Sequence, residues 1–293
     1  MAFPTYTKTF HTSSYPTSNP SNPAISTAGK VVVITGGGSG LGVTTHSPRL
    51  RRVRMNQLSL LGRTPSTLLS TKTSLQTLHP TIQVLTFTAD ITSLPSLTHA
   101  LSTTASTLGP IDTLVSNAAY CPDPSPIGTG PVDEWFRGME VNVRGNLHLV
   151  QIFLQYCASG EAEKRVFVHV STGGAHLLPL GSGMSGYAIS KLAATRVVDY
   201  FGMENLGRVR VMNVHPGVLQ TDMNRKAVEA GFVLPYDDVE LSASFIVWSA
   251  SHEAEFLKGK LIWANWDVEE LKAKKEILEK TDELTIGLIG WGA

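Results

Sequence analysis

The chain has 293 residues, of which 42% are hydrophobic, and this is enough to bury a sizeable core within one domain. The 24 Lys and Arg residues are balanced by 24 Asp and Glu residues, so no net field attracts nucleic acid or an acidic membrane, and a neutral small molecule is the expected partner. The two cysteines, Cys121 and Cys157, form no C-x-x-C motif, which excludes a disulfide framework or zinc ribbon and predicts a reducing, cytoplasmic location.

The chain begins with a segment, residues 1–28, that contains Pro4, Pro16, Pro20 and Pro23. Proline removes a backbone donor and disfavours helix and strand interiors, so this segment is predicted to be an extended N-terminal arm, either lying on the surface or disordered. No later stretch approaches the ~18 consecutive apolar residues of a membrane helix, and no membrane contact is expected.

Short β-branched runs then alternate with longer helical stretches. Strands buried on both faces of a parallel sheet are mostly apolar, and these runs fit that pattern. We therefore predict an α/β fold over residues 29–270, a doubly wound, Rossmann-type parallel sheet of about seven strands with helices on both faces. Residues 271–293 are expected to form a C-terminal helix, exposed over 271–280, and a tail. The predicted strands are 31–35, 58–61, 82–88, 113–116, 166–170, 209–214 and 261–264, and the predicted helices are 92–108, 135–157, 187–206 and 241–251.

A glycine-rich turn over residues 35–42, Thr-Gly-Gly-Gly-Ser-Gly-Leu-Gly, directly follows the first predicted strand. Glycine lets the backbone turn tightly and approach a pyrophosphate, whose charge is met by free N–H groups and the positive end of a helix dipole. The alternative is a flexible linker, but the position between a strand and a helix favours a phosphate-binding turn. The predicted cofactor contacts are Gly36, Ser39, Gly40, Leu41 and Gly42.

The end of the second predicted strand bears on which dinucleotide would bind. In dinucleotide-binding folds an acidic residue there bonds to the adenosine ribose, whereas an Arg can meet a 2′-phosphate. Residues 58–63 contain no carboxylate and end in Arg63. NADP(H) is therefore favoured over NAD(H), the alternative being that Arg63 is a solvated residue opening a loop.

Asp90 and Asn117 close the third and fourth predicted strands. Ligands of open parallel sheets bind at the carboxyl ends of the strands, so both residues are candidate cofactor contacts. Asp and Asn also favour strand-to-helix turns, and taken singly each residue is better explained in that way.

Tyr187 and Lys191 form the candidate reactive pair. Their four-residue spacing, at the start of a predicted helix, places both side chains on one helix face. A nearby ammonium favours the phenolate and is expected to lower the pKa of Tyr187 from about 10 toward neutrality, where the group could act as acid or base in ketone reduction. The motif alone is weak, so its position among the other motifs carries the argument.

The order of these elements resembles the short-chain dehydrogenase/reductase family from about residue 30 to residue 266. The family pattern has T-G-x-x-x-G-x-G, an N-A-G-like turn, a Ser before Y-x-x-x-K, and P-G-x-x-x-T. All four occur here in that order, the last of them at residues 216–221.

The resemblance implies a role for each matching residue. Tyr187 would be the general acid/base, and Lys191 would lower its pKa and hold the nicotinamide ribose. Asn142 would hold a water in the proton relay. Val218 and Thr221 would contact the cofactor in a loop that closes over a small-molecule carbonyl or alcohol substrate.

Two small departures concern the turns around the site. Thr172 stands where the family usually has the second of two serines, and its hydroxyl offers the same donor and acceptor. We expect Thr172 to polarise the carbonyl, with Ser171 as the second choice. Ala119 replaces the usual glycine of the N-A-G turn and adds a methyl group near the cofactor.

The largest departure is residues 43–57, where the family has an Ala-rich amphipathic helix. A helix that begins at Gly40 would hold Pro48 in its interior, at a cost of ~3 kcal/mol or more, whereas Ser47 could cap a later helix with Pro48 in its first turn. We hypothesise that this stretch is altered relative to a functional ancestor and weakens NADPH binding. The alternative to an active enzyme is therefore a non-catalytic or impaired cofactor-binding protein.

The remaining features point away from other classes. The nine histidines are scattered without an H-E-x-x-H motif, so no metal is expected, and His169 and His215 are expected to be satisfied structural residues. The basic run 49–54 is expected to be a solvated face. The proline-rich arm and residues 259–267 resemble reductases of fungal biosynthetic clusters, which implies secondary metabolism. Self-association into a homo-oligomer is left open.

Overall fold

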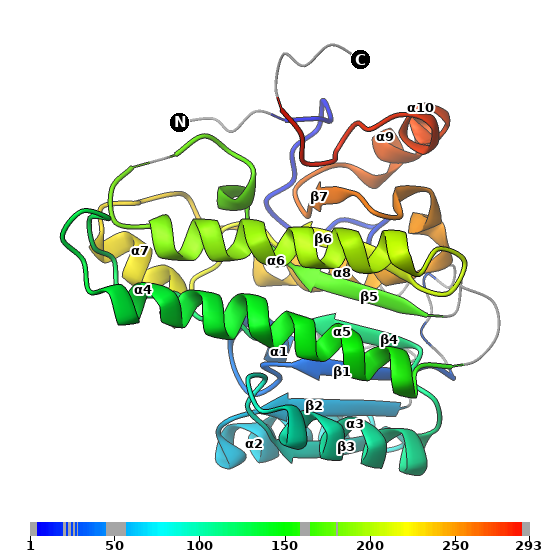
Figure 1. The fold of residues 1–293 in the computed structure, drawn as a ribbon. Coiled ribbons are helices and arrows are strands. Elements are labelled where there is room, and N and C mark those ends of the chain that lie inside the picture. The colour runs from blue at the N-terminus through cyan, green and yellow to red at the C-terminus, as the bar shows by residue number, and fades with distance from the viewer. Residues whose placement is uncertain are drawn as a thin grey trace.

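The computed structural model describes residues 5–19, 22, 25, 27, 29–44, 57–158, 165–179 and 181–288. They form a seven-stranded, all-parallel sheet in the order β3-β2-β1-β4-β5-β6-β7 (Figure 1). Strand order therefore runs outward in both directions from the centre, as in a doubly wound sheet. The predicted fold class is confirmed.

Each strand lies within one residue of its predicted position, because buried parallel strands are continuous apolar runs that are easy to delimit. The sheet also covers the expected part of the sequence, from the glycine turn to the run that ends near residue 264. The strands are β1 (Val31–Thr35), β2 (Gln57–Gly62), β3 (Gln83–Thr88), β4 (Thr113–Ser116), β5 (Val166–Val170), β6 (Arg210–His215) and β7 (Leu261–Trp263).

Two apolar clusters cover the two faces of the sheet, because successive side chains of a strand point to opposite faces. On β1, Val32 and Ile34 belong to one cluster, whereas Val31 and Val33 belong to the other. The first cluster includes residues of α1 (Gly40–Thr44), α2 (Pro65–Leu78) and α8 (Val239–Ala250), and the second includes residues of α3 (Leu94–Leu108), α5 (Gly145–Tyr156) and α6 (Ser185–Glu204).

The predicted helix 135–157 is a longer composite rod. It consists of α4 (Val132–Met139), a π-helical turn (Glu140–Arg144) and α5. The structure adds two helices that the sequence did not predict, α2 and α7 (Asp222–Glu229).

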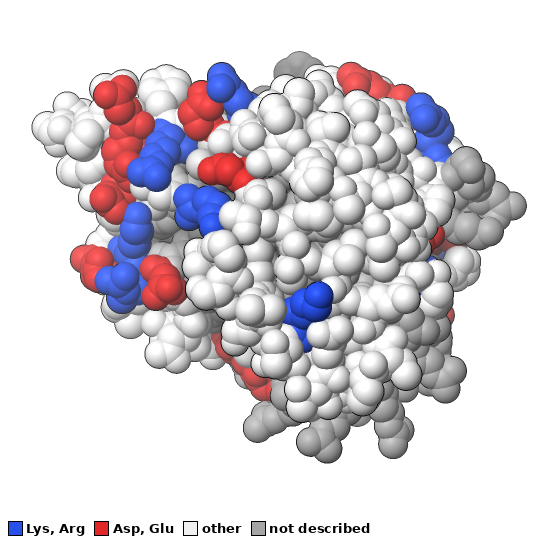
Figure 2. Space-filling model, turned by 90° about the horizontal axis from the view of Figure 1, so that it is seen from below, with Lys and Arg blue, Asp and Glu red and all other residues white. Residues whose placement is uncertain are grey.

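Helix α2 was missed because it lacks the contrast between an apolar and a charged face by which amphipathic helices are recognised. It is rich in Ser and Thr, and Lys72 is its only charged residue. Helix α3, on the opposite face of the sheet, has no Asp, Glu, Lys or Arg. Figure 2 shows the molecule from the side of these helices, where charged side chains gather at one side and leave most of the surface without charge.

Residues 271–280 are not one exposed helix, so that prediction is wrong. The region holds α9 (Val268–Ala273) and α10 (Lys275–Lys280), which meet at Lys274. Leu271 and Leu278 are both 0% exposed. The Lys- and Glu-rich composition concealed two leucines that anchor the helices in the core.

The described part of the N-terminal arm lies against the C-terminal part of the domain, as the blue segment beside β7 in Figure 1 shows. The His11 N–H donates to the Asn265 carbonyl at 2.7 Å, and the His11 ring bonds to Asp267 at 2.8 Å. The Asp238 N–H donates to the Thr12 carbonyl at 2.8 Å. The arm thereby braces both β7 and the start of α8.

The segment on which the impaired-protein hypothesis rests is only partly described. A helix does begin at Gly40, and α1 is followed to Thr44. Residues 45–56, which include Ser47, Pro48 and the basic run 49–54, lie outside the described residues. The hypothesis therefore stays a prediction. Within the ranges that are described, no helix combines the length and apolarity of a membrane span.

Candidate active site

The predicted site elements meet at the carboxyl edge of the sheet, in a cleft of about 1490 Å³. Ligands of open α/β sheets bind at this edge. The cleft runs from the glycine turn after β1 to the tail residues Thr285–Gly287. Every predicted site residue lines it except Gly42 and Asn142.

The glycine turn is too tightly folded to hold side chains. A Cβ on Gly42 would stand 2.2 Å from the Gly36 carbonyl oxygen, and one on Gly38 would stand 2.4 Å from Thr67 Oγ1. Gly36 and Gly40 adopt φ values of +68° and +52°, which favour glycine. The turn therefore presents backbone to the cleft, a surface that fits a pyrophosphate.

Asn117 lies beneath this turn and ties β4 to β1. Its Nδ2 donates to the Thr35 carbonyl at 2.9 Å, and its backbone N–H donates to Thr35 Oγ1 at 3.0 Å. The same Nδ2 lies 2.8 Å from where a Gly36 side chain would begin. Asn117 thus supports the shape of the glycine turn.

Arg63 and Asp90 stand at the ends of β2 and β3. Arg63 is exposed and lines the cleft directly after Gly62. Asp90 accepts two hydrogen bonds from Thr92, both at 2.8 Å. Burial acts to raise the pKa of Asp90, but the Thr92 bonds and the positive charges of Arg63 and Arg137 outweigh it, so that the pKa is lowered. Arg63 and Asp90 therefore act on each other electrostatically at this corner.

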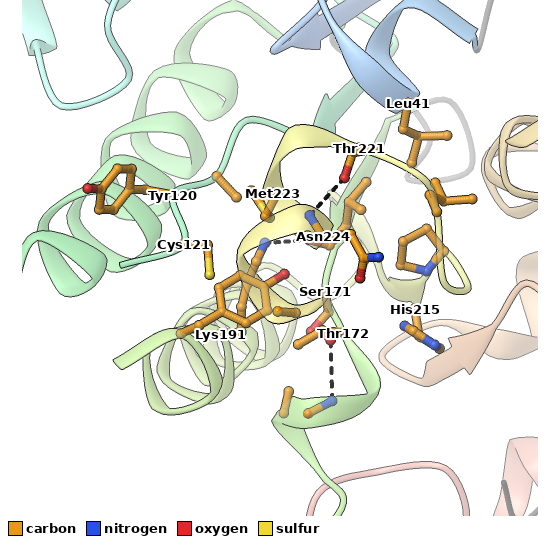
Figure 3. A pocket seen from close by; sticks show the side chains of 18 of the residues that line it. Leu41, Tyr120, Cys121, Ser171, Thr172, Lys191, His215, Thr221, Met223 and Asn224 are labelled. Atoms are coloured by element: carbon orange, nitrogen blue, oxygen red, sulfur yellow. Dashed lines mark hydrogen bonds between the residues drawn. The ribbon is translucent and has the colours of Figure 1, made fainter. Parts of the chain in front are cut away.

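The two neighbouring hydroxyls after β5 point to different places. Ser171 is buried, and its Oγ lies 2.8 Å from Thr195 Oγ1 on α6. The Thr172 Oγ1 accepts from the Gly174 N–H at 3.3 Å (Figure 3), and the Thr172 side chain interacts with that of Tyr187 and acts to lower its pKa. Thr172 is therefore the hydroxyl that lies toward Tyr187, and Ser171 is turned toward Thr195.

The pKa of Tyr187 is raised, not lowered. Burial is the main cause, the neighbouring Cys121 adds to it, and the Thr172 hydrogen bond only partly offsets it. The expectation that Lys191 moves this pKa toward neutrality is wrong here, because removing the phenolate from water dominates and Lys191 is not among the groups that shift the pKa. Tyr187 is a neutral phenol at neutral pH.

Lys191 is 2% exposed, and its Nζ donates to the Val170 carbonyl at 2.7 Å. Burial lowers the pKa of Lys191 to about 7. Figure 3 shows Lys191 beside the cleft with Cys121, Ser171 and Thr172 around it. The lysine is thus held at the end of β5, one helical turn beyond Tyr187 on α6.

Asn142 does not face the cleft. It lies in the π-helical turn, is 0% exposed, and exchanges two hydrogen bonds of 2.8 Å with the Tyr120 backbone. Its Nδ2 also donates to Ser190 Oγ at 2.9 Å, and Ser190 Oγ donates to the Tyr187 carbonyl at 2.8 Å. Asn142 therefore positions the start of α6 from behind the cleft wall.

The loop after β6 folds over the glycine turn. A Cβ on Gly40 would stand 3.4 Å from Thr221 Cγ2, and Thr221 caps α7 by accepting from the Asn224 N–H at 3.2 Å. The Val218 N–H donates to Asp237 Oδ2 at 2.8 Å. Sequence analysis missed Asp237, because it stands 19 residues beyond its partner with no local motif.

Sequence analysis also missed Cys121 and His176 and set His215 aside. Cys121 is 4% exposed beside Tyr187, and burial raises the pKa of its thiol to about 11. Among the described residues, neither His215 Nδ1 nor His169 Nε2 has a hydrogen-bond partner, although His169 Nδ1 bonds to Asn213 at 2.9 Å. The expectation that both histidines are satisfied is therefore wrong.

No group of three His, Cys, Asp or Glu side chains that could hold a metal occurs in the described ranges. Tyr187 and Lys191 lie one helical turn apart on α6 and both line the cleft. Together with a backbone-lined turn and a hydroxyl pair, they form a site suited to proton transfer beside a bound dinucleotide.

Known proteins with similar sequences and structures fit this geometry. The sequence pattern of the short chain dehydrogenase family matches residues 30–231. The chain is 32% identical over 290 residues to the short chain dehydrogenase/reductase AacuD of Aspergillus aculeatus, covering 98% of both chains. It is 31% identical over 293 residues to a short chain dehydrogenase/reductase of Claviceps purpurea, covering 98% of this chain and 96% of the relative.

Solved structures show the same fold. A levodione reductase matches with a TM-score of 0.71 at 22% identity, covering 81% of this chain and 96% of the other. A short-chain dehydrogenase/reductase from Serratia marcescens matches with a TM-score of 0.70 at 23% identity, covering 80% of this chain and 96% of the other.

Proposed function

The chain belongs to the short-chain dehydrogenase/reductase family of nicotinamide-dependent oxidoreductases, and we propose that it interconverts a ketone and a secondary alcohol on a small organic substrate with NADP(H). One observation carries the proposal, the convergence of the Thr172 and Tyr187 side chains at the cleft wall. Two hydroxyls that converge on one point suit a carbonyl oxygen, because each can stabilise the negative charge that develops there.

In this proposal Tyr187 supplies the proton. Burial raises the pKa of its phenol, so Tyr187 keeps its proton at neutral pH and releases it as charge develops on the carbonyl oxygen. Thr172 donates to the same oxygen and orients the carbonyl. The bound nicotinamide cofactor supplies the hydride. The resting protonation state of Tyr187 therefore favours ketone reduction.

Lys191 supports this step from the next turn of α6. Because burial lowers its pKa to about 7, its charge is sensitive to small changes around neutral pH. Lys191 is proposed to contact the nicotinamide ribose, the role that the family resemblance implies. Asn142 acts through Ser190 on the Tyr187 backbone and is a positioning residue.

The preference for NADP(H) rests on Arg63. It is exposed at the cleft directly after β2, and the neighbouring Thr64 and Thr67 add hydroxyls at the same corner. Because β2 has no carboxylate, a 2′-phosphate at its end would lie beside the Arg63 guanidinium and would not be repelled by a negative charge on that strand. Gly36, Ser39, Gly40 and Leu41 are proposed to hold the pyrophosphate, with Val218 and Thr221 closing over it.

We further propose a cytoplasmic enzyme of fungal secondary metabolism. The supporting observations are the two free cysteines, relatives from Aspergillus and Claviceps, and the resemblance over residues 259–267. A homo-oligomer is a further proposal, which the mass of the purified protein in solution would test.

The proposal is tested by mixing the purified protein with NADPH or NADH and a panel of ketones, followed at the nicotinamide absorbance. We expect oxidation of NADPH with at least one cyclic ketone and slower oxidation of NADH. The non-catalytic alternative expects cofactor binding, measured by calorimetry, without turnover of any ketone.

A further inference from the structure

Beyond Thr172 the cleft reaches a cluster of three rings that the proposed reaction does not use. His176 follows the turn after β5, His215 ends β6, and Trp263 ends β7. All three line the cleft. They lie at the carboxyl ends of β5, β6 and β7, whereas the glycine turn follows β1, two strands away from β5 in the sheet.

Trp263 fixes the hydrogen-bonding state of His176. The indole is 1% exposed, and its Nε1–H donates to His176 Nε2 at 2.9 Å, with the ring centroids 5.5 Å apart. Since Nε2 accepts, the neutral imidazole must carry its proton on Nδ1. His176 is exposed where it lines the cleft, and its partial desolvation lowers its pKa below the ordinary 6.5, so the ring is neutral at neutral pH. No described residue accepts a hydrogen bond from Nδ1, which is left as a donor.

His215 completes the cluster. Its ring meets Trp263 edge to face, at 4.4 Å between centroids and 71° between planes. It is 7% exposed, and its Nδ1 has no partner among the described residues. A buried polar atom without a partner is costly unless a ligand or water satisfies it.

The distance between the reactive hydroxyl and His176 is fixed by one short turn. Thr172 opens the 3₁₀ turn Gly173–Ala175, and the His176 N–H closes it by donating to the Gly173 carbonyl at 3.1 Å. A Cβ on Gly173 would stand 3.1 Å from Trp263 Cζ2, so the turn rests directly on the indole. Thr172 and His176 are therefore two fixed points on one rigid support.

The surroundings of this cluster are apolar. Leu177, Leu178, Phe232 and Ile286 also line the cleft, and Leu177 Cδ1 stands 3.5 Å from a Cβ built on Gly173. An apolar lining with one neutral donor favours a ring system with an isolated oxygen over a charged substrate.

We propose that His176, oriented by Trp263, is a specificity-determining residue that binds a second oxygen, a hydroxyl or carbonyl, on an apolar ring substrate whose ketone lies at Thr172 and Tyr187. This inference rests on the proposed function and narrows its substrate class to oxygenated cyclic ketones. His215 borders the same subsite and offers it a second polar atom.

The test compares 1-tetralone with its 5-, 6- and 7-hydroxy derivatives as substrates for ketone reduction with NADPH. The wild type is expected to reduce at least one hydroxylated isomer with a kcat/KM about threefold to tenfold above that of 1-tetralone, the range of one neutral hydrogen bond. In His176→Phe this ratio should fall to about one, while 1-tetralone turnover and NADPH affinity are kept. Because 76% of the His252 side chain is exposed and His252 does not line the cleft, His252→Phe is the matched control and should keep the ratio.

Two further variants guard against misfolding of His176→Phe. His176→Gln keeps a hydrogen-bond donor and should retain part of the preference for the hydroxylated isomer. Trp263→Phe keeps an aromatic ring but loses the N–H that fixes the His176 tautomer, so this variant should lose part of that preference. The proposal is overturned if no hydroxylated isomer is preferred by the wild type, or if the preference survives in His176→Phe.

Binding separates this inference from the proposed function. The affinities of 1-tetralone and its hydroxylated isomers are measured by quenching of tryptophan fluorescence, without cofactor. A binding preference that depends on His176, in a protein that turns over no ketone, would support the subsite and reject the reductase. Turnover without any such preference would keep the reductase and reject the subsite.

Discussion

The wall of the cleft that follows β1 is made of backbone, whereas the wall that leads from β5 into α6 is made of buried side chains. Gly36 and Gly42 pack so closely that no Cβ fits between them. Lys191 and His215, in contrast, are titratable groups that are almost fully buried. The first wall depends on glycine, which has no side chain, and the second depends on polar side chains that are buried away from water.

This difference has an electrostatic consequence. Burial raises the pKa of Tyr187 and lowers those of Lys191 and His215, to about 7 and about 3. In each case the neutral form is favoured, because desolvation disfavours charge. The wall that leads from β5 into α6 therefore carries a desolvation cost for its titratable side chains, and the glycine wall, which has no such side chains, does not.

The largest expected loss of turnover comes from a change in the wall that leads from β5 into α6. Tyr187→Phe keeps the ring but removes the proton donor, so ketone turnover should fall about 10³-fold or more. NADPH affinity, measured by calorimetry, should stay within about twofold of the wild type, because the glycine wall is untouched. Equal turnover by this variant would remove Tyr187 from the mechanism.

Lys191→Met tests whether Lys191 contributes both to turnover and to cofactor binding. Turnover should fall about 10²-fold or more, since the cation beside the acid is lost. NADPH affinity should fall as well, because the proposed ribose contact is lost. Steady-state rates and calorimetry on one protein sample measure both. A change in turnover alone would contradict the ribose contact.

Gly42→Ala tests the glycine wall by itself. The new methyl group would meet the Gly36 carbonyl 2.2 Å away, so the turn must shift, and NADPH affinity should weaken about tenfold or more while 1-tetralone binding is unchanged. Gly128→Ala is the control, because nothing lies within 4 Å of its Cβ. Unchanged NADPH affinity in Gly42→Ala would show that the turn does not hold the phosphates.

Arg63→Ala should act only on cofactor choice. A charge-assisted contact to a 2′-phosphate contributes about 1.5 to 3 kcal/mol, so its loss should narrow the NADPH over NADH preference about tenfold or more. The ratio of the two dissociation constants is the measurement. Arg144→Ala, which removes an exposed cation that is paired with Glu140 and does not line the cleft, should leave that ratio as it is.

The smallest effect is the response of stability to acid. Because the folded pKa of His215 is about 3 and its ordinary value is 6.5, the unfolded chain binds more protons between these values, and stability falls as the pH drops from 6.5 toward 3. Melting temperatures at pH 7 and pH 5 should differ by a few degrees. His215→Phe should reduce that difference. An equal difference in both proteins would show that His215 takes up a proton in the folded protein as readily as in the unfolded chain, and so that its pKa is not lowered by folding.

The sequence by itself determined the architecture and the reactive pair. Continuous β-branched runs delimited the seven strands, because burial on both faces leaves a one-dimensional signal. The glycine turn and the Tyr187–Lys191 spacing could be located in the same way, since each depends on residues that are close in the chain. Helix α2 was not predicted, because Ser and Thr on its outer face leave little contrast in polarity between its exposed and buried faces.

Only the tertiary structure decided how these groups are used. It turned Ser171 toward Thr195 and Thr172 toward Tyr187, a choice that two adjacent hydroxyls cannot reveal. It buried Tyr187, and so raised a pKa that the neighbouring lysine was expected to lower. It also joined Val218 to a distant Asp237. Local spacing fixes which residues share a helix face, but burial and contacts between distant segments depend on the packing of the whole chain.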